Sequence, residues 1–479
     1  MPGRDLQLAT PDQSASHADA PALETPAHPS ARIPALDGVR GVAILIVMVS
    51  HLSERFSVTS PALRWLKAVL FAGWTGVDLF FVLSGFLITG ILFDAKGGAG
   101  YFRNFYARRT IRIFPLYYVA LAIIFWVAPI VAPKSAPADW DSLHYSLARH
   151  YWPWFCTYMV DVLVAWKGFL FGGHFWTLAV EEHFYLVWPF LVYRLSHRAL
   201  IATSLLLMMA AVVLRFNMAI WGASESAIYV LTPCRTDGLA LGAFLALTVR
   251  APAGLRTLLR LARLVLPAAT ALWIALFFLE PGWSQYGLIP QTLGYAVTAA
   301  FYGCVLVFTL GSQRLSAAMS AGPLRFLGKI SYALYVFHPF IFSLIAPSFA
   351  LGAPSHYSVV VAWLPHLFGG ANASGLFPVL DGVVFAVLAA GLSVGAALLS
   401  WYALEAPCLR LRRLFPYAKK AAAGVLAELP RARSFTSAGK LPGATSDRSC
   451  RLCGGLCARR RAWRGAGRTE APGRAAGWP

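Results

Sequence analysis

Long apolar runs, interrupted by single charged residues, recur along most of the chain. A helix needs about 20 consecutive, mainly apolar residues to cross the hydrocarbon core of a bilayer. The pattern predicts ten transmembrane helices, at about residues 36 to 54, 74 to 93, 113 to 132, 174 to 193, 199 to 219, 228 to 248, 264 to 280, 290 to 310, 330 to 349 and 380 to 403.

Composition agrees with this interpretation, since 58% of the 479 residues are apolar and only 13% are charged. We therefore predict an all-α, polytopic membrane helical bundle of about ten transmembrane helices, occupying residues 33–410. Residues 1–32 are rich in Pro, Ala, Ser and His and lack the pattern of a cleaved signal peptide, so we expect a disordered cytoplasmic leader. Residues 411–479 are basic and lack apolar periodicity, and we expect a disordered cytoplasmic tail.

The distribution of Lys and Arg predicts the orientation in the membrane. The predicted loops on the side of the N-terminus carry more than twice as many of these residues as the loops on the opposite side. Positive loops stay in the cytoplasm, so both termini are predicted to be cytoplasmic. The formal net charge of +20 then reflects topology and the basic tail, and we do not predict binding to nucleic acid.

The seven cysteines do not form the pattern of an exported disulfide framework. Cys450, Cys453 and Cys457 have the spacing of a metal knuckle, but no convincing fourth ligand follows, and we predict no metal site. The predicted loop at 133–173 is rich in aromatic residues, which are typical of a membrane interface and would also suit stacking on sugar rings. Its aromatic residues are Trp140, Tyr145, Tyr151, Trp152, Trp154, Phe155, Tyr158 and Trp166.

Arg40 and His51 stand out within the first apolar run. Eleven residues correspond to almost three helical turns, so both side chains should lie on one helix face, about 16 Å apart along its axis. Ionisable groups inside a membrane span cost several kcal/mol and are functional candidates by default. A snorkelling Arg and a packing His are the structural alternative.

Further ionisable residues fall within other predicted spans, mostly in their outer halves. Such groups are tolerated if they pair with one another or line a wet cavity, and a purely structural salt network is one possibility. The other is that a carboxylate orients His51 and raises its basicity, which would make it a general base. The candidates are Asp78, Glu181, Glu182, His183, Arg235, Asp237 and His338.

Three arginines, Arg108, Arg109 and Arg112, gather at the entrance of the third predicted span. Residues four apart share a helix face, so the guanidinium groups lie within one turn of each other. This arrangement suits a polyanion such as the phosphates of a nucleotide or coenzyme. From charge alone, these arginines would equally serve as positive-inside anchors.

Seven ordered blocks resemble the acyltransferase-3 family of integral-membrane acyltransferases, which move acetyl or other short acyl groups onto hydroxyls of exported glycans or related acceptors. The first block, 36–41, continues to His51 and contains the R-x10-H pattern of that family. The others are 76–88, 108–115, 176–185, 235–242, 330–339 and 402–407, and the resemblance covers about residues 33 to 410. The sequence departs from the family pattern at Thr177, where Ser is usual, and at His183, where Gln is usual.

The resemblance implies catalytic roles for Arg40, His51 and Glu181. It also implies that Arg108, Arg109 and Arg112 bind the phosphates of an acyl-CoA donor, and we expect this donor to be acetyl-CoA. On this interpretation His51 acts as a general base or takes the acyl group itself, with Glu181 orienting it. Arg235 would hold the acceptor or stabilise the oxyanion. We further assign Asp78, Trp176, Tyr185, Asp237 and His338 to substrate binding, although Pro339 also suggests a packing role for His338.

The predicted acceptor is a carbohydrate or small-molecule hydroxyl reached at the outer half of the membrane, and the family implies a bacterial inner membrane. The acceptor's identity, the acyl group and the oligomeric state are not encoded in these motifs. The alternative from another class is a proton-coupled transporter or flippase of a glycan or lipid-linked sugar, since buried charges in ten spans suit a carrier as well.

Overall fold

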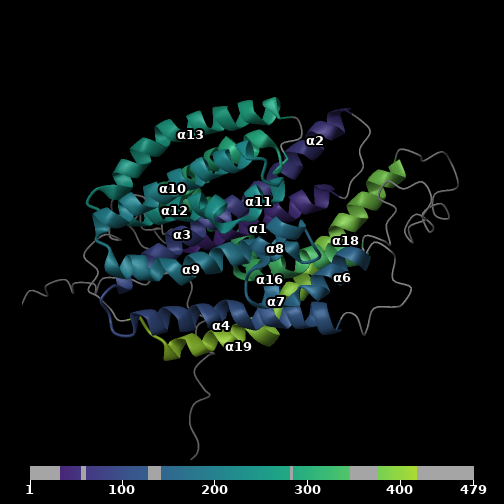
Figure 1. Ribbon diagram of the computed structural model, residues 1–479, viewed down its shortest axis with the longest axis horizontal. Helices are drawn as coiled ribbons and strands as arrows, with labels where there is room; N and C mark the ends of the chain where they lie inside the picture. The colour runs from purple at the N-terminus through teal and green to yellow at the C-terminus, as the bar shows by residue number, and fades with distance from the viewer. Residues whose placement is uncertain (1–32, 55–60, 128–141, 281–283, 346–375, 418–479) are drawn as a thin grey trace, which may run out of the picture. The chain divides into compact units, whose positions relative to one another are not determined.

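The computed structural model describes residues 33–54, 61–127, 142–280, 284–345 and 376–417, and within these ranges every regular element is helical (Figure 1). The first half contains α1 (Pro34–Glu54), α2 (Pro61–Phe71), η1 (Ala72–Thr75), α3 (Gly76–Ala95), α4 (Tyr101–Ala122), η2 (Ile123–Val127), α6 (Ser142–His150), α7 (Trp152–Cys156), α8 (Val160–Lys167), η3 (Gly173–Phe175), α9 (Trp176–Arg194) and α10 (His197–Ile220). The second half contains α11 (Glu225–Val230), α12 (Thr232–Val249), α13 (Gly254–Leu279), η4 (Pro290–Gly294), α14 (Tyr295–Gly311), α15 (Gln313–Met319), α16 (Gly322–Ile345), α18 (Leu376–Ser400), η6 (Trp401–Glu405), α19 (Ala406–Arg410) and η7 (Leu411–Leu414).

Each of the ten predicted spans coincides with a helix in the described ranges. In this part of the chain, nine helical segments are long and apolar enough to cross a membrane. The tenth, α9, is 19 residues long, but Glu181, Glu182 and His183 interrupt its apolar sequence. The predicted all-α polytopic bundle is thus confirmed, while the predicted cytoplasmic position of both termini stays a prediction. The predicted leader, most of the tail and Cys450, Cys453 and Cys457 lie outside the described residues.

Local sequence signals set several helix boundaries. Ser196, Ser224 and Ser312 each precede a helix, and each side chain accepts a hydrogen bond from the backbone N–H three residues on. Such caps satisfy N–H groups that have no partner within the helix. The aromatic loop predicted at 133–173 is folded, where it is described, into the short helices α6, α7 and α8.

Helix α1 lies against both α16 and α3, and glycines allow the backbones to touch. A Cβ atom added at Gly41 would collide with the Leu324 carbonyl, and one at Gly328 would collide with the Asp37 carbonyl. Between α3 and α12, Gly85 and Gly242 permit an equally close approach. Small residues at such crossings are the usual means of close helix packing in membranes, where lipid supplies little hydrophobic driving force. These contacts fix the position of α1, which carries Arg40 and His51.

We expect Gly328→Ala to destabilise the bundle, because the added methyl group must push α16 away from α1. Gly391→Ala in α18 is the matched control, since a Cβ there meets no atom within 4 Å. The control should be neutral or slightly stabilising, by up to about 1 kcal/mol, because Ala has the higher helix propensity. Thermal unfolding of both variants in detergent tests this, and equal midpoints for the two would contradict the packing account.

Candidate active site

Two cavities of different chemical character lie along α1. Arg40 lines the first together with Arg109 and Arg112, and we call it the arginine cavity. His51 lines the second, which we call the histidine cavity. The predicted common helix face for Arg40 and His51 therefore leads into two neighbouring spaces rather than one.

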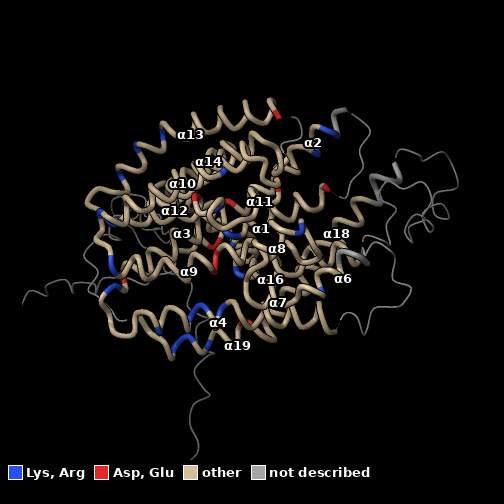
Figure 2. The backbone as a smooth tube through the Cα atoms, viewed as in Figure 1, with Lys and Arg blue, Asp and Glu red and all other residues tan. Residues whose placement is uncertain are grey.

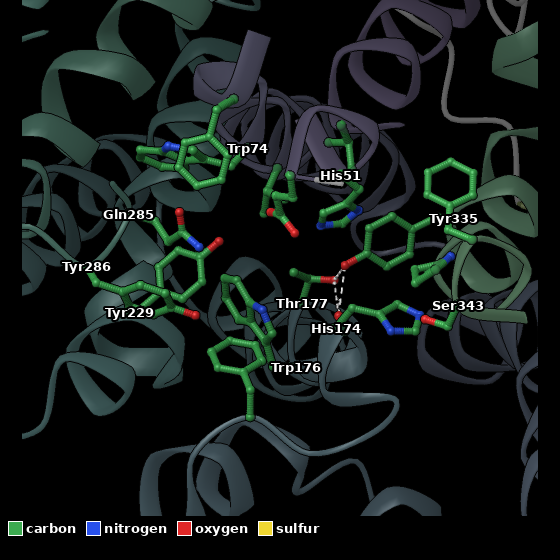
Figure 3. Close-up of a pocket in the computed structure, with 17 residues that line it drawn as sticks. His51, Trp74, His174, Trp176, Thr177, Tyr229, Gln285, Tyr286, Tyr335 and Ser343 are labelled. Carbon is green, nitrogen blue, oxygen red and sulfur yellow. Dashed lines mark hydrogen bonds between the residues drawn. The ribbon is translucent and has the colours of Figure 1, made fainter. Parts of the chain in front are cut away.

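The histidine cavity has a volume of about 540 Å³. In Figure 3, Trp74, Trp176 and Tyr229 lie across the cavity from His51 and Tyr335. The aromatic walls come from elements far apart in sequence, since Trp74 precedes α3, Trp176 begins α9 and Tyr229 belongs to α11. Apolar walls with a few polar groups are typical of a small-molecule or carbohydrate-sized binding site.

His51 meets a second imidazole at the edge of this cavity. Its Nδ1 atom lies 2.8 Å from Nε2 of His338, and the two rings are stacked with centroids 5.1 Å apart. His338 is fully buried in α16, and its Nδ1 atom lies 2.8 Å from the Leu334 carbonyl oxygen. His338, predicted as a substrate-binding residue, is therefore a direct neighbour of the candidate catalytic histidine.

The arginine cavity is smaller, about 90 Å³, and is rich in charge. Besides the three guanidinium groups, Glu181 and Tyr185 of α9 line it, and the Arg109 guanidinium lies 5.3 Å from the centre of the Tyr185 ring. Among the described residues, none of the three arginines forms an ion pair with a carboxylate within 4 Å. This leaves positive charge in excess of the single carboxylate in the wall.

The two cavities share three lining residues, Val77, Thr177 and Tyr335, which we call the neck. The Tyr335 hydroxyl lies 2.6 Å from Thr177 Oγ1 and donates to the His174 carbonyl at 2.8 Å (Figure 3). Thr177 is one of the two departures from the family pattern, and it lies where the cavities meet. The second departure, His183, hydrogen bonds to Thr232 at 2.7 Å and lines neither cavity.

Glu181, which we expect to orient His51, lies in the wall of the arginine cavity. Glu181 accepts a hydrogen bond of 2.5 Å from Ser84 and faces the arginine cavity. Helix α9 runs beside α3, and the register of that pair brings Glu181 to Ser84 rather than to the end of α1 that carries His51.

The three arginines of α4 have different surroundings. Arg109 and Arg112 line the arginine cavity, whereas Arg108 donates hydrogen bonds to the carbonyls of Arg412, at 3.1 Å, and Phe415, at 3.0 Å. Figure 2 shows basic positions of α4 and of the segment after α18 side by side. Arg108 thus attaches the chain after α18 to α4 and does not line the cavity.

Two ion pairs are buried between helices and line neither cavity. Arg235 contacts Asp78 at 2.7 Å, and Arg215 contacts Asp237 at 2.8 Å. The Arg235 guanidinium also lies 3.9 Å from the centre of the Tyr295 ring. These contacts hold α3, α10, α12 and α14 together, so the structure gives Arg235, Asp78 and Asp237 packing partners rather than exposure to a cavity.

Several buried or cavity-lining residues escaped the sequence-based selection. Arg215 lies within the apolar helix α10, and a single Arg in such a run was a sufficient signal. His174, at the start of a predicted span, carried the same signal as the selected histidines. Ser84 and Tyr335 carry no comparable signal, because neutral polar residues are common in membrane helices. No group of three or more His, Cys, Asp or Glu residues suited to a metal ion occurs in the described part of the chain.

Comparison with known proteins identifies relatives of the chain. Residues 33–402 match the model of a family described as "Acyltransferase domain". The "Putative peptidoglycan O-acetyltransferase YrhL" of Bacillus subtilis is 30% identical over 349 residues, which cover 69% of this chain and 51% of that protein. The peptidoglycan O-acetyltransferase OatA of Listeria monocytogenes is 28% identical over 349 residues, covering 69% and 52%.

The O-acetyltransferase OatA of Staphylococcus aureus is 26% identical over 325 residues, which cover 64% of this chain and 50% of that protein. The chain thus matches about half the length of each of these curated relatives. No solved structure matches the chain.

Helix α3 offers an internal comparison between a buried and an exposed ion pair. Asp78→Asn should destabilise the protein by about 3 kcal/mol or more, because it leaves the Arg235 charge buried and without its carboxylate. Asp94→Asn removes the partner of Arg250, the residue that directly follows α12. The Asp94 side chain is 59% exposed, so this change should cost at most about 1 kcal/mol.

Unfolding of both variants in detergent measures the difference. Similar losses of stability for Asp78→Asn and Asp94→Asn would show that the buried pair does not hold these helices together.

Proposed function

The chain belongs to the acyltransferase-3 family, and from that premise we propose that it transfers an acyl group from acyl-CoA to a hydroxyl group of a glycan. The observation that carries this proposal is the adjacency of the two cavities. A cationic cavity and an aromatic, imidazole-bearing cavity share a neck of three residues. A phosphate-bearing donor and a carbohydrate acceptor are the two ligands that these chemistries suit.

The donor site is the arginine cavity. Three guanidinium groups around one carboxylate leave a net positive charge inside a protein, where unmatched charge is costly. A polyanion relieves this cost, and guanidinium forks suit phosphate oxygens. The phosphates of coenzyme A meet this requirement, with Arg109 and Arg112 as the residues that bind them. Arg108 supports the site indirectly, by holding the segment after α18 against α4.

The reacting group is His51. With the phosphates at Arg109 and Arg112, the pantetheine arm would run past Arg40 and through the neck toward His51. There His51 either takes the proton of the acceptor hydroxyl, so that its oxygen attacks the thioester carbonyl, or accepts the acyl group and passes it on. Glu181 belongs to the donor side of this arrangement, where it balances part of the arginine charge.

The acceptor site is the histidine cavity. Its aromatic walls suit the apolar faces of a sugar ring, and the polar side chains of Gln285 and Glu54 at its edge suit hydroxyl groups. Trp176 contributes to this wall, in keeping with its predicted role in substrate binding. None of the described aromatic residues predicted as an interface belt lines the cavity, whereas Phe169 does. The names of the relatives point to peptidoglycan as the first acceptor to test.

The positive-inside rule places the donor site on the cytoplasmic side, since the basic start of α4 leads into the arginine cavity. Coenzyme A thioesters are cytoplasmic compounds, so this orientation matches the supply of donor. The multi-pass bundle is then a bacterial inner-membrane protein that carries an acyl group from the cytoplasm to an acceptor on the other side.

Purified protein in liposomes should release coenzyme A from acetyl-CoA when peptidoglycan fragments or crude bacterial glycans are present. We expect His51→Ala to abolish this release and to leave the affinity for coenzyme A unchanged, because His51 lies outside the arginine cavity. A thiol assay and a binding titration measure the two quantities. Coenzyme A binding with undiminished release in His51→Ala would remove His51 from the mechanism.

Arg109→Gln should raise the KM for acetyl-CoA by about tenfold to a hundredfold, because a hydrogen bond to a charged group contributes about 1.5–3 kcal/mol. Arg103→Gln is the matched control, since Arg103 is an exposed arginine on the same helix and lines neither cavity. Steady-state kinetics at fixed salt test both variants. Equal KM values for the two would place the phosphates elsewhere.

A further inference from the structure

The contact between His51 and His338 contains one hydrogen bond, and its direction determines the tautomer of His51. The two nitrogens that face each other, Nδ1 of His51 and Nε2 of His338, are 2.8 Å apart, so one hydrogen lies between them. A neutral imidazole has one protonated nitrogen and one nitrogen with a lone pair. The partner of the second nitrogen of His338 therefore shows which ring donates.

The second nitrogen of His338 has a defined partner. Its Nδ1 atom lies 2.8 Å from the carbonyl oxygen of Leu334, one helical turn earlier in α16. A carbonyl oxygen only accepts hydrogen bonds, so Nδ1 of His338 carries the hydrogen. In neutral His338 the lone pair is then on Nε2, which faces His51. His338 is fully buried, and the helix backbone keeps its ring in this orientation.

Consequently the hydrogen between the rings belongs to His51. We propose that His338 is a positioning residue that holds His51 as its Nδ1–H tautomer, so that Nε2 of His51 is the nitrogen that reacts. The inference rests on the proposed acyl transfer for its chemical meaning, but the tautomer itself follows from the three contacting groups. In proteins generally, the hydrogen bond made by one ring nitrogen of a histidine determines which nitrogen is protonated.

The tautomer determines the path of the proton. The acceptor hydroxyl gives its proton to Nε2 of His51 while its oxygen forms a bond to the thioester carbonyl carbon. The carbon–sulfur bond then breaks, and the departing sulfur takes the proton from Nε2, which yields the ester and free coenzyme A. Throughout, Nδ1–H of His51 stays bonded to Nε2 of His338, and His338 neither gains nor loses a proton.

The sequence-based prediction has a carboxylate orient His51, and the structure adds His338, an uncharged partner that contacts Nδ1 of His51. His174 is the next imidazole in the group, with its ring centroid 6.4 Å from that of His338.

Two substitutions separate positioning from packing. His338→Gln keeps an oxygen near the place of Nε2 that can accept from His51, but it removes the ring. His338→Phe keeps a stacked ring but has no acceptor. If His338 positions His51, we expect His338→Phe to lower kcat about a hundredfold with KM for acetyl-CoA unchanged, and His338→Gln to recover most of that loss. A packing role gives the reverse order, with Phe the better replacement, and would overturn the proposal.

A second measurement needs no activity. Nitrogen-15 spectra of histidine-labelled protein in liposomes report which nitrogen of each ring is protonated, and His51→Gln assigns the signals of His51. We expect a protonated Nδ1 and an unprotonated Nε2 for His51, and loss of this preference in His338→Phe. Leu344→Ala, an exposed position on the same helix, is the control and should leave the spectrum of His51 unchanged.

The two measurements distinguish two failures. A wild-type His51 protonated at Nε2 overturns the positioning role whatever the activity. The expected tautomer in a protein that releases no coenzyme A with any acceptor would leave the histidine pair intact and refute the proposed function instead.

Discussion

The backbone contact between α1 and α16 determines the rest of the site. Glycines at this crossing bring the helices so close that a Cβ atom added at Gly41 or Gly328 would collide with the main chain of the other helix. Because α1 carries Arg40 and His51 on one face, fixing it sets both groups at once. The same contact places His338 beside His51 and Tyr335 in the neck. Helix α3, which also packs against α1, places Val77 in the neck and Ser84 in the wall of the arginine cavity.

Buried charges in this bundle fall into two kinds. Arg235 with Asp78 and Arg215 with Asp237 are matched pairs that line neither of the two cavities, and they hold helices together. The arginine cavity is lined by three cations and one carboxylate. Unmatched positive charge of this kind is unfavourable for helix packing but favours binding of an anionic ligand. Matched and unmatched charge thus distinguish the arginines that pack helices together from the arginines that we propose to bind the donor.

Much of the fold was predictable, because apolar run length is a direct consequence of bilayer thickness, and each of the ten predicted spans is helical where the structure describes it. The common face of Arg40 and His51 also followed from helix geometry. The contacts that these side chains make with other helices did not follow from the sequence. The contact of Glu181 with Ser84, the attachment of Arg108 to the chain after α18, and the pairing of His51 with His338 depend on how helices far apart in sequence are rotated against each other. The apolar pattern of a single helix does not specify how that helix is rotated against its neighbours. Arg215 is a different case, since its isolated charge was visible in the sequence.

We propose that donor and acceptor reach the neck from opposite sides of the membrane. The most direct test reconstitutes the protein in liposomes in one known orientation, with acetyl-CoA confined to one side and glycan acceptor to the other. We expect coenzyme A release only when acetyl-CoA is on the side of the membrane where the basic start of α4 lies. Equal release with donor and acceptor exchanged, or release only when both are on the side opposite the start of α4, would contradict this proposal.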